Sequence, residues 1–372
     1  MVIVHDTVSI DMPTLAGLIK SWGQELGLAE VRISDTDLSH LEPGFEAWLA
    51  AGHHGDMDYM AAHGRRRTRP AELVPGTVRV ICVRLNYLPP VAGPDWRERE
   101  LARLDDGAAA VVAIYARGRD YHKVLRARLQ RLAERIEQHV GAFGYRVFTD
   151  SAPVMELGLA EKAGLGWRGK HTLVLDRSAG SMFFLGEIYT DLPLPVDAPV
   201  APHCGACSAC IAVCPTKAIL GPYQIDARLC ISYQTIENKA SIPEELRPLL
   251  GNRVFGCDDC QLVCPWNKFA QRATLPDFDV RNDLDSATLL ELFSWSEEEF
   301  MQRLQGSPIR RIGHERWLRN IAVGLGNAAR AGLCGDAAIM AGLAQRREHP
   351  SAMVREHVAW ALAQHSASNG QP

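Results

Sequence analysis

Eight of the ten cysteines in this chain lie between residues 204 and 264. They are Cys204, Cys207, Cys210, Cys214, Cys230, Cys257, Cys260 and Cys264. The first four have two, two and three residues between them, the last three have two and three, and a proline follows each of these runs. This spacing is typical of a ferredoxin with two four-iron four-sulfur clusters. Such a segment has to fold around its clusters, so it constrains the chain more than any other feature.

The same rule assigns the ligands. In each run the first three thiolates bind one cluster, and the last, before proline, binds the other cluster. Cluster 1 is therefore predicted to bind Cys204, Cys207, Cys210 and Cys264. The second run lacks its first ligand because Val254 stands three residues before Cys257, and Cys230 is the nearby spare thiol. Cluster 2 is predicted to bind Cys214, Cys230, Cys257 and Cys260.

Three other interpretations of the cysteines are disfavoured. A structural zinc site takes four ligands in one closed tetrahedron, whereas these cysteines divide into two sets of four. Disulfides would accompany secretion, and residues 1–11 show no basic segment followed by an apolar core. A radical enzyme that uses S-adenosylmethionine would need a cysteine where Lys217 stands. We therefore expect iron–sulfur clusters in a cytoplasmic protein.

The composition is that of an ordinary soluble protein, with 372 residues, 47% hydrophobic residues and a net charge of −4. This length favours two or three domains. No apolar stretch is long enough to span a bilayer, so we expect no membrane partner. Net acidity disfavours a generally basic nucleic-acid binder but leaves room for local basic patches.

Short β-branched runs alternate with helical patterns in the first half of the chain. Strands are expected at 78–85, 111–115, 145–148, 172–175 and 182–189. Between them, apolar residues recur at helical spacing and stop at Gly141; they are Leu125, Leu129, Leu132, Ile136 and Val140. This alternation predicts an α/β domain over residues 1–195.

Prolines at 193, 195, 199 and 202 mark the end of that domain, because proline can continue neither a helix nor a central strand. The ferredoxin-like domain is expected at 196–272. Residues 273–372 are expected to be helical and carry a weak repeat, in which Leu318-Arg319 is echoed by Val354-Arg355. The period of this repeat is typical of stacked two-helix units.

Four arginines lie at the start of the helical repeat: Arg310, Arg311, Arg316 and Arg319. With Trp317 among them, they suit phosphate contacts and base stacking. A solvated helix face would explain the same residues equally well.

Electron transfer alone would need only the cysteine-rich segment, so the first domain should bind a substrate or a second cofactor. The chain contains neither the glycine-rich dinucleotide-binding fingerprint nor a phosphate-binding P-loop. Asp120-x-His122 is similar to a motif that supplies a histidine to cobalt in some cobalamin proteins, but Leu125 stands where that motif has glycine. From these residues alone the second cofactor stays open.

Several stretches together resemble the epoxyqueuosine reductase family, whose cobalamin-dependent members complete queuosine in tRNA. These stretches are Gly118–Lys123, Asp150–Pro153, Ala160–Trp167, Gly251–Arg253 and Ile309–Asn320. The resemblance extends from about residue 10 to about residue 365. Arg65 and Arg66, ahead of Arg67, are small departures beside the motifs.

The resemblance implies an oxidoreductase that removes the epoxide of epoxyqueuosine at the wobble base of tRNAs with GUN anticodons. The oxygen leaves as water, and the reaction consumes two electrons and two protons. The implied cofactors are two 4Fe-4S clusters and cobalamin bound base-off, and the cobalamin carries the difficult chemical step. A low-potential electron donor must supply the clusters.

The resemblance also implies that Asp150 is the proton donor. Asp150 follows the strand expected at 145–148, and α/β folds often place functional groups after a strand. Burial beside the corrin would raise the pKa of its carboxyl group towards neutrality. The alternative is a helix N-cap, with Pro153 early in the helix. Capping preferences alone favour that alternative, and the resemblance reverses the order.

The glycine-rich segment Gly164–His171 suits close approach to a large flat cofactor, although a simple loop would also explain its glycines. The cobalamin-pocket residues implied by the resemblance are Arg67, Asp150, Lys170, His171, Val174, Leu185 and Ser232. His171 is assigned to the pocket and not to the cobalt. The implied tail is HEAT-like and contacts the anticodon arm through Arg310, Arg311, Arg316 and Arg319.

Four arginines between residues 65 and 69 form another candidate anion site, or a solvated loop. Cys82 and Cys334 lie outside the cluster motifs and are expected to be buried thiols. Two rival functions share some of these features. A corrinoid dehalogenase would normally begin with an export signal, and a plain electron carrier would need neither a corrin nor a basic tail. A monomer is expected.

Overall fold

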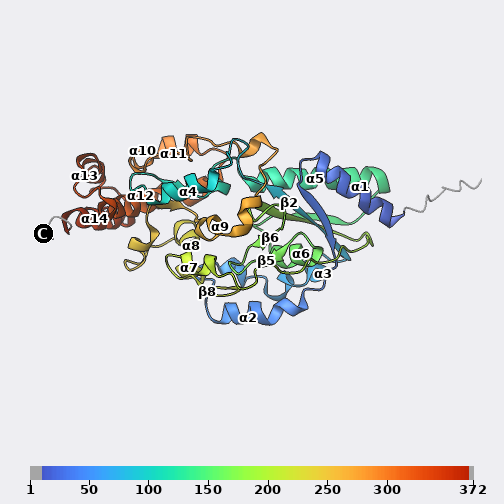
Figure 1. Ribbon diagram of the computed structural model, residues 1–372. Coiled ribbons are helices and arrows are strands. Elements are labelled where there is room, and N and C mark those ends of the chain that lie inside the picture. The colour runs from blue at the N-terminus through green and yellow to red at the C-terminus, as the bar shows by residue number, and fades with distance from the viewer. Residues whose placement is uncertain (1–10, 368–372) are drawn as a thin grey trace, which may run out of the picture.

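The computed structural model describes residues 11–367. A sheet with its helices lies at one end of an elongated molecule, helices from the end of the chain lie at the other, and the cysteine-rich segment lies between them (Figure 1). Within the described residues, no helix is both long enough and apolar enough to cross a membrane.

The sheet has four strands in the order β1 (Glu30–Ser34), β2 (Arg79–Asn86), β7 (Phe183–Thr190) and β4 (Tyr145–Phe148). All three pairings are antiparallel. The predicted mixture of strands and helices is present, but the α/β label needs correction, because the helices flank an antiparallel sheet without parallel crossover units. The sequence did not predict β1.

Helices cover both faces of this sheet. Phe184 and Ile188 of β7 pack with side chains of α1 (Met12–Glu25) and α5 (Tyr121–Val140). Leu185 and Tyr189 pack on the opposite face with α6 (Glu156–Ala163). Because strand side chains alternate between faces, Glu187 lies on the α6 face with them. This face lies next to the loop that carries Asp150.

The start of α5 is fixed by its N-cap. The side chain of Asp120 accepts a hydrogen bond from the backbone N–H of His122 at 3.2 Å. The helix ends at Gly141, whose φ of 82° suits glycine. The first four residues of the predicted apolar stripe have no exposed surface. Tyr121 and His122 are therefore held in the first turn of a well-packed helix.

The cysteine-rich segment is built from short elements. They are α7 (Ala209–Val213), β8 (Ile219–Gly221), β9 (Gln224–Ile225), α8 (Ile231–Ile236), β10 (Arg253–Phe255) and α9 (Asp259–Leu262). Strand β10 pairs in parallel with β3 (Val111–Val112) from the first part of the chain. The hairpin β5 (Trp167–Arg168)–β6 (Val174–Leu175) contributes to the same region. The remaining helices before it are α2 (Glu42–Ala50), α3 (Pro70–Leu73) and α4 (Trp96–Asp105).

The tail is helical, as predicted. Its helices are α10 (Leu289–Ser294), α11 (Glu297–Arg303), α12 (Gly313–Ala328), α13 (Ala337–Ala344) and α14 (Ala352–Ala367). Capping boxes begin α10 at Thr288 and α11 at Ser296. Leu318 and Val354, which begin the two copies of the repeated motif, are both fully buried.

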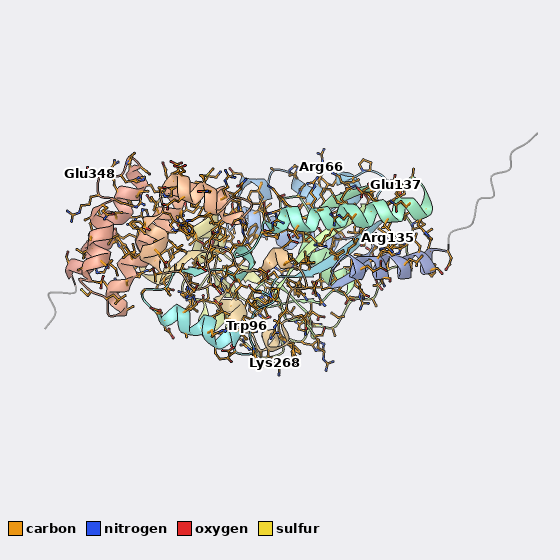
Figure 2. All side chains as sticks on the ribbon, turned by 90° about the horizontal axis from the view of Figure 1, so that it is seen from above. Arg66, Trp96, Arg135, Glu137, Lys268 and Glu348 are labelled. Carbon is orange, nitrogen blue, oxygen red and sulfur yellow. The ribbon has the colours of Figure 1, made fainter. Side chains whose placement is uncertain are left out.

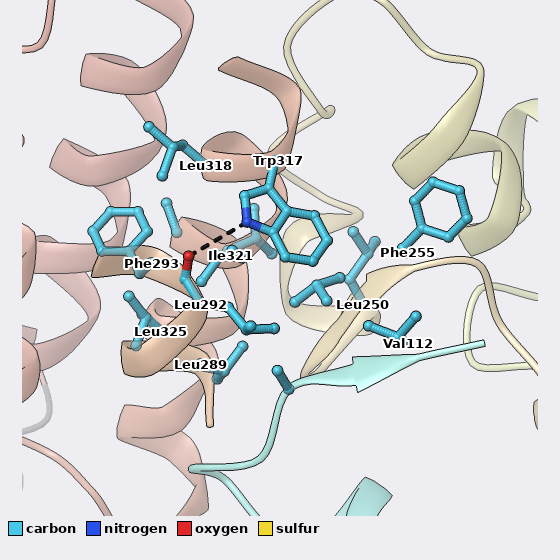
Figure 3. Packing of buried hydrophobic residues seen from close by; sticks show 14 of the residues in the cluster. Val112, Leu250, Phe255, Leu289, Leu292, Phe293, Trp317, Leu318, Ile321 and Leu325 are labelled. Atoms are coloured by element: carbon cyan, nitrogen blue, oxygen red, sulfur yellow. Dashed lines mark hydrogen bonds between the residues drawn. The ribbon is translucent and has the colours of Figure 1, made fainter. Parts of the chain in front are cut away.

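One hydrophobic core joins the tail to the cysteine-rich segment. It includes Val112, Phe255, Trp317 and Val354. Figure 3 shows the Trp317 ring amid this core, with its Nε1 donating a hydrogen bond to the Leu292 carbonyl at 3.4 Å. The packing therefore crosses residue 272, and the domain limits 1–195, 196–272 and 273–372 stay a prediction.

Candidate active site and cluster-binding segment

Asp150 lies in the turn between β4 and α6. Its φ is 29°, a region that residues other than glycine rarely adopt. Helix α6 begins at Glu156 with Met155 as its N-cap, so Asp150 does not cap the helix. The capping role considered from the sequence is therefore wrong, and the strained backbone of Asp150 needs another explanation.

Two side chains from the first turn of α5 hold the Asp150 carboxylate. The Tyr121 hydroxyl donates a hydrogen bond to Oδ2 of Asp150, and His122 Nε2 lies 3.1 Å from the same oxygen. His122 Nδ1 lies 2.8 Å from Oδ1 of Asp120. The backbone N–H of Asp150 donates to Glu156 Oε1 at 2.5 Å. Asp150 is thus one end of a continuous Asp120–His122–Asp150 chain.

The protonation states follow from these contacts. The surrounding protein removes part of the solvent from Asp150 and so disfavours its charge, although 52% of its side-chain surface stays exposed. Hydrogen bonds from His122 and Tyr121 outweigh this effect and lower its pKa. Burial also disfavours a charged His122, but Asp120 and Asp150 raise its pKa to about 9. Burial and the Asp150 charge raise the pKa of Glu156 to about 8. At neutral pH Asp150 is ionised, with a proton on His122 beside it.

The α6 face of the sheet contains further buried polar groups. Glu187 has no exposed surface, and burial, with the charges of Glu156 and Asp150, raises its pKa well above the ordinary value. Within residues 11–367, neither Glu187 carboxyl oxygen, nor the Tyr189 hydroxyl, nor Arg67 Nε has a hydrogen-bond partner. Buried polar atoms normally have partners. This face therefore suits contact with a further polar group.

Three of the predicted cofactor residues lie on this face. Arg67 is 5% exposed, and its Nη1 atom lies 3.5 Å from the Val154 carbonyl in the loop before α6. Val174 is buried with Val154 in one hydrophobic cluster, and Leu185 packs against that cluster. Arg67, Val174 and Leu185 therefore surround the loop that carries Asp150, as expected for one pocket, and their cofactor contact stays a prediction.

The other three cofactor candidates lie near the cysteines. Lys170 Nζ donates to the carbonyls of Gly205 at 2.7 Å and Cys207 at 2.8 Å. His171 is 3% exposed, and burial lowers its pKa to about 4, so its ring is neutral. Ser232 is in the first turn of α8, directly after Cys230 and Ile231. Lys170 and His171 thus belong with cluster 1, and Ser232 with cluster 2.

The cluster 1 cysteines surround a pocket of about 810 Å³. Its lining includes all four predicted ligands: Cys204, Cys207, Cys210 and Cys264. Cys207 is exposed, whereas Cys210 and Cys264 are buried. Burial and the three other thiols raise the pKa of Cys264 to about 11. The chain therefore brings together the four predicted ligands from its two cysteine runs, and their assignment to a cluster stays a prediction.

The cluster 2 cysteines are electrostatic neighbours as well. Burial raises the pKa of Cys230, and the Cys214 charge adds to the effect. Burial raises the pKa values of Cys257 and Cys260 well above the ordinary value, with a contribution from Cys230 in both cases. None of these four cysteines is exposed. Metal binding would convert such thiols to thiolates.

Carboxylates surround the second group. Asp259 forms a buried ion pair with Arg253 at 2.5 Å and accepts from the Cys257 thiol at 3.1 Å. Asp258 accepts the Ile114 N–H at 2.7 Å, and burial raises its pKa to about 6. In the described part of the chain, no three His, Cys, Asp or Glu side chains are close enough to hold a single metal ion.

Two of the four predicted RNA-contacting arginines donate hydrogen bonds to backbone carbonyls of the protein. Arg319 has no exposed surface and donates to the carbonyls of Gln234, Asn238 and Ala240 at 2.5–2.8 Å. Arg316 donates to three carbonyls, including Ile236 at 2.9 Å. Full burial argues against RNA contact by Arg319, whereas Arg316 is partly exposed and its RNA contact stays a prediction. Both residues help to anchor α8 to α12.

The other two arginines are accessible. Arg311 is exposed and paired with Glu237 at 2.5 Å, and its charge helps to lower the Asp150 pKa. Arg310 is exposed and lines a second pocket, of about 770 Å³. Six basic side chains line that pocket: Arg119, Lys123, Arg128, Arg131, Arg281 and Arg310. Its two acidic residues are Asp120 and Asp277. We call this pocket the basic groove, and Asp120 connects it to the Asp150 site.

Among the arginines between residues 65 and 69, two form ion pairs and one is buried. Arg65 pairs with Glu46 at 3.3 Å, and Arg69 pairs with Glu42 at 2.8 Å. Arg67 is buried and contacts the loop before α6, as described above. The segment therefore acts in part as a set of structural ion pairs, and it does not form one open anion site.

Sequence patterns do not identify four side chains at the site: Tyr121, His122, Glu156 and Glu187. The only sequence signal for the first pair was Asp120-x-His122 at a helix start. Cys82 is buried as expected, and Cys334 is partly buried with its thiol 3.2 Å from the His365 carbonyl.

Two family models match the chain. One, described as a 4Fe-4S double cluster binding domain, matches residues 203–267. The other, described as "Epoxyqueuosine reductase QueG, DUF1730", matches residues 67–151. The first match contains all eight predicted cluster cysteines, which favours two clusters over the zinc site considered above.

Whole-chain comparisons point the same way. An epoxyqueuosine reductase from Burkholderia pseudomallei is 64% identical over 374 residues, covering 94% of this chain and 91% of that protein. One from Escherichia coli is 56% identical over 356 residues, covering 95% and 90%. A crystal structure of epoxyqueuosine reductase with a tRNA-Tyr epoxyqueuosine-modified stem loop has a TM-score of 0.84 at 24% identity, covering 95% of this chain and 90% of that one. That structure shares the fold described here.

Proposed function

This chain belongs to the epoxyqueuosine reductase family, and we propose on this basis that it removes the epoxide oxygen of epoxyqueuosine in tRNA. The reaction consumes two electrons and two protons, releases water and leaves queuosine. The observation that carries the proposal is the position of Asp150, held by Tyr121 and His122 beside a groove whose charged residues are mainly basic.

Asp150 is proposed to donate a proton to the epoxide oxygen. Its side chain is 52% exposed, so a bound base could cover it. Loss of water would favour the neutral acid and raise its pKa from the lowered value found here. His122 has a pKa of about 9, and its Nε2 lies 3.1 Å from Oδ2 of Asp150. Its proton can therefore reprotonate Asp150. Asp120 keeps that imidazole charged and oriented.

Electrons are proposed to pass along the two clusters. The Cys260 thiol of the second group is an electrostatic neighbour of Cys210 in the first. Burial raises the pKa of Tyr115, and the charges of Asp150 and Asp258 add to this effect. Asp258 directly follows Cys257. We propose that electrons pass from the first group to the second group and then towards the substrate at Asp150.

The α6 face of the sheet fits the proposed cobalamin. Bound base-off, cobalamin would supply the strong reductant that breaks a carbon–oxygen bond. Val174 and Leu185 would contact its flat apolar surface, and Arg67 its polar groups. The buried atoms without partners on Arg67, Glu187 and Tyr189 are the observation that supports this fit. His171 is not needed as a ligand, since it lies at the cluster 1 pocket.

The basic groove is proposed to bind the phosphates of the tRNA anticodon arm. Exposed Lys123, Arg131 and Arg310 line it, and phosphate contacts of this kind position an RNA while leaving its loop bases free. Arg311 follows Arg310 in the chain, and its charge helps to lower the Asp150 pKa. The tail, which we propose to be HEAT-like, carries Arg310 and Arg311. A monomer in the cytoplasm, where tRNA is found, is the simplest setting.

The proposal is tested by conversion of the substrate. The anaerobically reconstituted protein is incubated with cobalamin, a low-potential reductant and tRNA that carries epoxyqueuosine, and the digested nucleosides are weighed by mass spectrometry. We expect the modified nucleoside to lose the mass of one oxygen. Asp150→Asn should slow conversion by at least about 100-fold, because general-acid catalysis contributes roughly 10²–10⁴.

Ser151→Ala is the matched control. Ser151 is exposed, follows Asp150 in the same turn and makes only one long contact, at 3.4 Å to the Thr149 carbonyl. This variant should convert the substrate at the normal rate. Absence of conversion by a wild-type protein with both clusters and bound corrin would disprove the substrate assignment. Normal conversion by Asp150→Asn would disprove only the role of Asp150.

A further inference from the structure

We infer that the rim of the cluster 1 pocket is the docking surface for an acidic electron-carrier protein. This inference rests on the proposed function, because it names the partner that supplies the two electrons. The rim is formed by Lys170, Arg177 and Lys268, and we call it the basic rim.

The charge of the basic rim differs from that of the whole chain. The chain has a net charge of −4, yet the described residues that line this pocket include three Lys or Arg and no Asp or Glu. The acid that precedes Arg177, Asp176, is paired with Arg84 at 3.0 Å and so is already neutralised. A local reversal of charge next to a redox site favours encounter with an oppositely charged partner.

The cations are positioned for such an encounter. Lys170 is fixed by the carbonyls of Gly205 and Cys207, so its charge is held at the loop of an exposed predicted ligand. Arg177 is exposed and has no hydrogen bond or ion pair among the described residues. Lys268 is exposed. Figure 2 shows it at one edge of the molecule, on the side opposite Arg66.

Aromatic side chains provide a contact surface between these charges. Phe269 is 40% exposed, and Lys268 Nζ lies 4.7 Å from its ring centroid. The Phe269 ring is 6.1 Å from that of Trp266, which is 5.1 Å from the buried ring of Trp167. Aromatic residues and arginine are enriched at protein interfaces. Such an interface can be small, because transient redox complexes are at the low end of interface size.

The predicted position of cluster 1 explains why a donor would bind at the basic rim. Its predicted ligand Cys207 is exposed, whereas none of the cluster 2 cysteines is. Electron transfer requires the donor centre to come close to the acceptor, so a protein donor can approach cluster 1 more closely. The basic groove cannot serve the same partner while it holds RNA, and it shares no lining residue with the cluster 1 pocket.

The electron balance is simple. In each encounter the carrier loses one electron and cluster 1 gains one. Two encounters supply the two electrons that the epoxide consumes, while the two protons come from water by way of Asp150. The carrier is oxidised, the substrate is reduced, and no further reactant is needed.

Charge reversal on the rim tests the inference. Reduced flavodoxin, a small acidic flavin protein, is mixed with the reconstituted enzyme in a stopped-flow instrument, and flavin oxidation and cluster reduction are followed by absorbance. Lys268→Glu and Arg177→Glu should each slow the second-order step about three- to tenfold at low salt, and salt should slow the wild type more than the variants.

Two controls separate docking from damage. Arg347→Glu makes the same charge change at an exposed site in the tail and should leave the rate unchanged. Reduced methyl viologen, a small cation, should reduce the clusters of the rim variants at least as fast as those of the wild type. Equal slowing with methyl viologen would mean that the clusters are damaged, and the rim would then have no demonstrated role in docking.

Other outcomes would overturn the inference. Normal flavodoxin rates in both rim variants, or the same slowing in Arg347→Glu, would show that the rim does not receive an acidic protein. A loss of tRNA binding in the rim variants would assign this surface to RNA. The proposed function is tested separately, because conversion of epoxyqueuosine driven by a chemical reductant needs no protein donor.

Discussion

The two cysteine groups lie in opposite surroundings. The cluster 1 group opens to a pocket whose charged side chains are basic, and one of its cysteines is exposed. The cluster 2 group is enclosed, and Asp258 and Asp259 lie beside its thiols. Arg253 forms an ion pair with Asp259. We therefore propose that the open end exchanges electrons with a partner and that the enclosed end directs them to the substrate.

Ligand spacing alone therefore does not determine the role that we propose for each cluster. Both groups follow the same sequence rule. Their roles differ because of residues far away in the chain, such as Lys170 at the open end and Arg311 at the enclosed end.

Loss of a cysteine at the enclosed end should break the electron path. Cys230→Ala is expected to lower the iron content from about eight to about four atoms per chain, because cluster 2 loses a ligand. Cluster 1 should still be reduced, but conversion of epoxyqueuosine should fall below detection. Iron analysis, electron paramagnetic resonance of the reduced protein and the conversion assay measure these three results. Full iron content would contradict the ligand assignment.

Loss of the buried Arg319 should destabilise the protein around cluster 2 without changing its affinity for RNA. Arg319→Leu would leave carbonyls of α8 and the segment after it without partners, which costs about 3 kcal/mol. We expect a lower unfolding temperature and faster loss of cluster 2 on warming, followed by circular dichroism and visible absorbance. Arg310→Leu, at an exposed site, is the matched control for stability. An unchanged unfolding temperature in Arg319→Leu would mean that the Arg319 hydrogen bonds contribute little to stability.

The pH dependence of turnover should report on His122. Its pKa is raised to about 9, so the imidazole is charged below that value and neutral above it. Conversion, driven by a chemical reductant, should therefore fall as the pH rises through about 9. His122→Gln should be roughly tenfold slower and lack this decline, since one positioned proton donor is lost. Cluster reduction by flavodoxin at the open end should not change in this variant.

The smallest effect is expected at the basic groove. Arg310→Ala should weaken tRNA binding by about three- to tenfold and reduce the salt dependence by about one ion, as loss of one phosphate contact would. Binding is measured by gel shift or fluorescence anisotropy at several salt concentrations. The rate of flavodoxin-driven cluster reduction should stay the same. If Arg310→Ala bound tRNA normally at every salt concentration, the groove would not be the RNA site.

Local patterns predicted the elements well but not their arrangement. The strands at β2, β4 and β7 and the helix α5 were expected nearly where they occur, because side-chain periodicity reflects burial on one face. The antiparallel order was not expected, because strand pairing depends on contacts between distant parts of the chain. Sequence alternation alone does not distinguish parallel from antiparallel neighbours.

The candidate site shows the same limit. Asp150 was identified by family resemblance, and its partners Tyr121 and His122 became clear only when the start of α5 was placed beside it. Arg319 shows the opposite error, since an arginine in a basic run can be fully buried when backbone carbonyls surround it. The number of charges in a run therefore gives no information on which of them reach solvent.

The core shared by the tail and the cysteine-rich segment also affects how the protein can be made. Phe255, two residues before Cys257, packs in the same core as Val354 and Trp360 near the end of the chain. A ribosome releases the N-terminus first, so this core cannot close until synthesis is nearly complete. We expect iron–sulfur assembly factors to act on the finished chain, and ribosomes stalled after residue 340 to carry a nascent chain without a stable second cluster. Stable cluster retention by such a stalled chain would contradict this order of events.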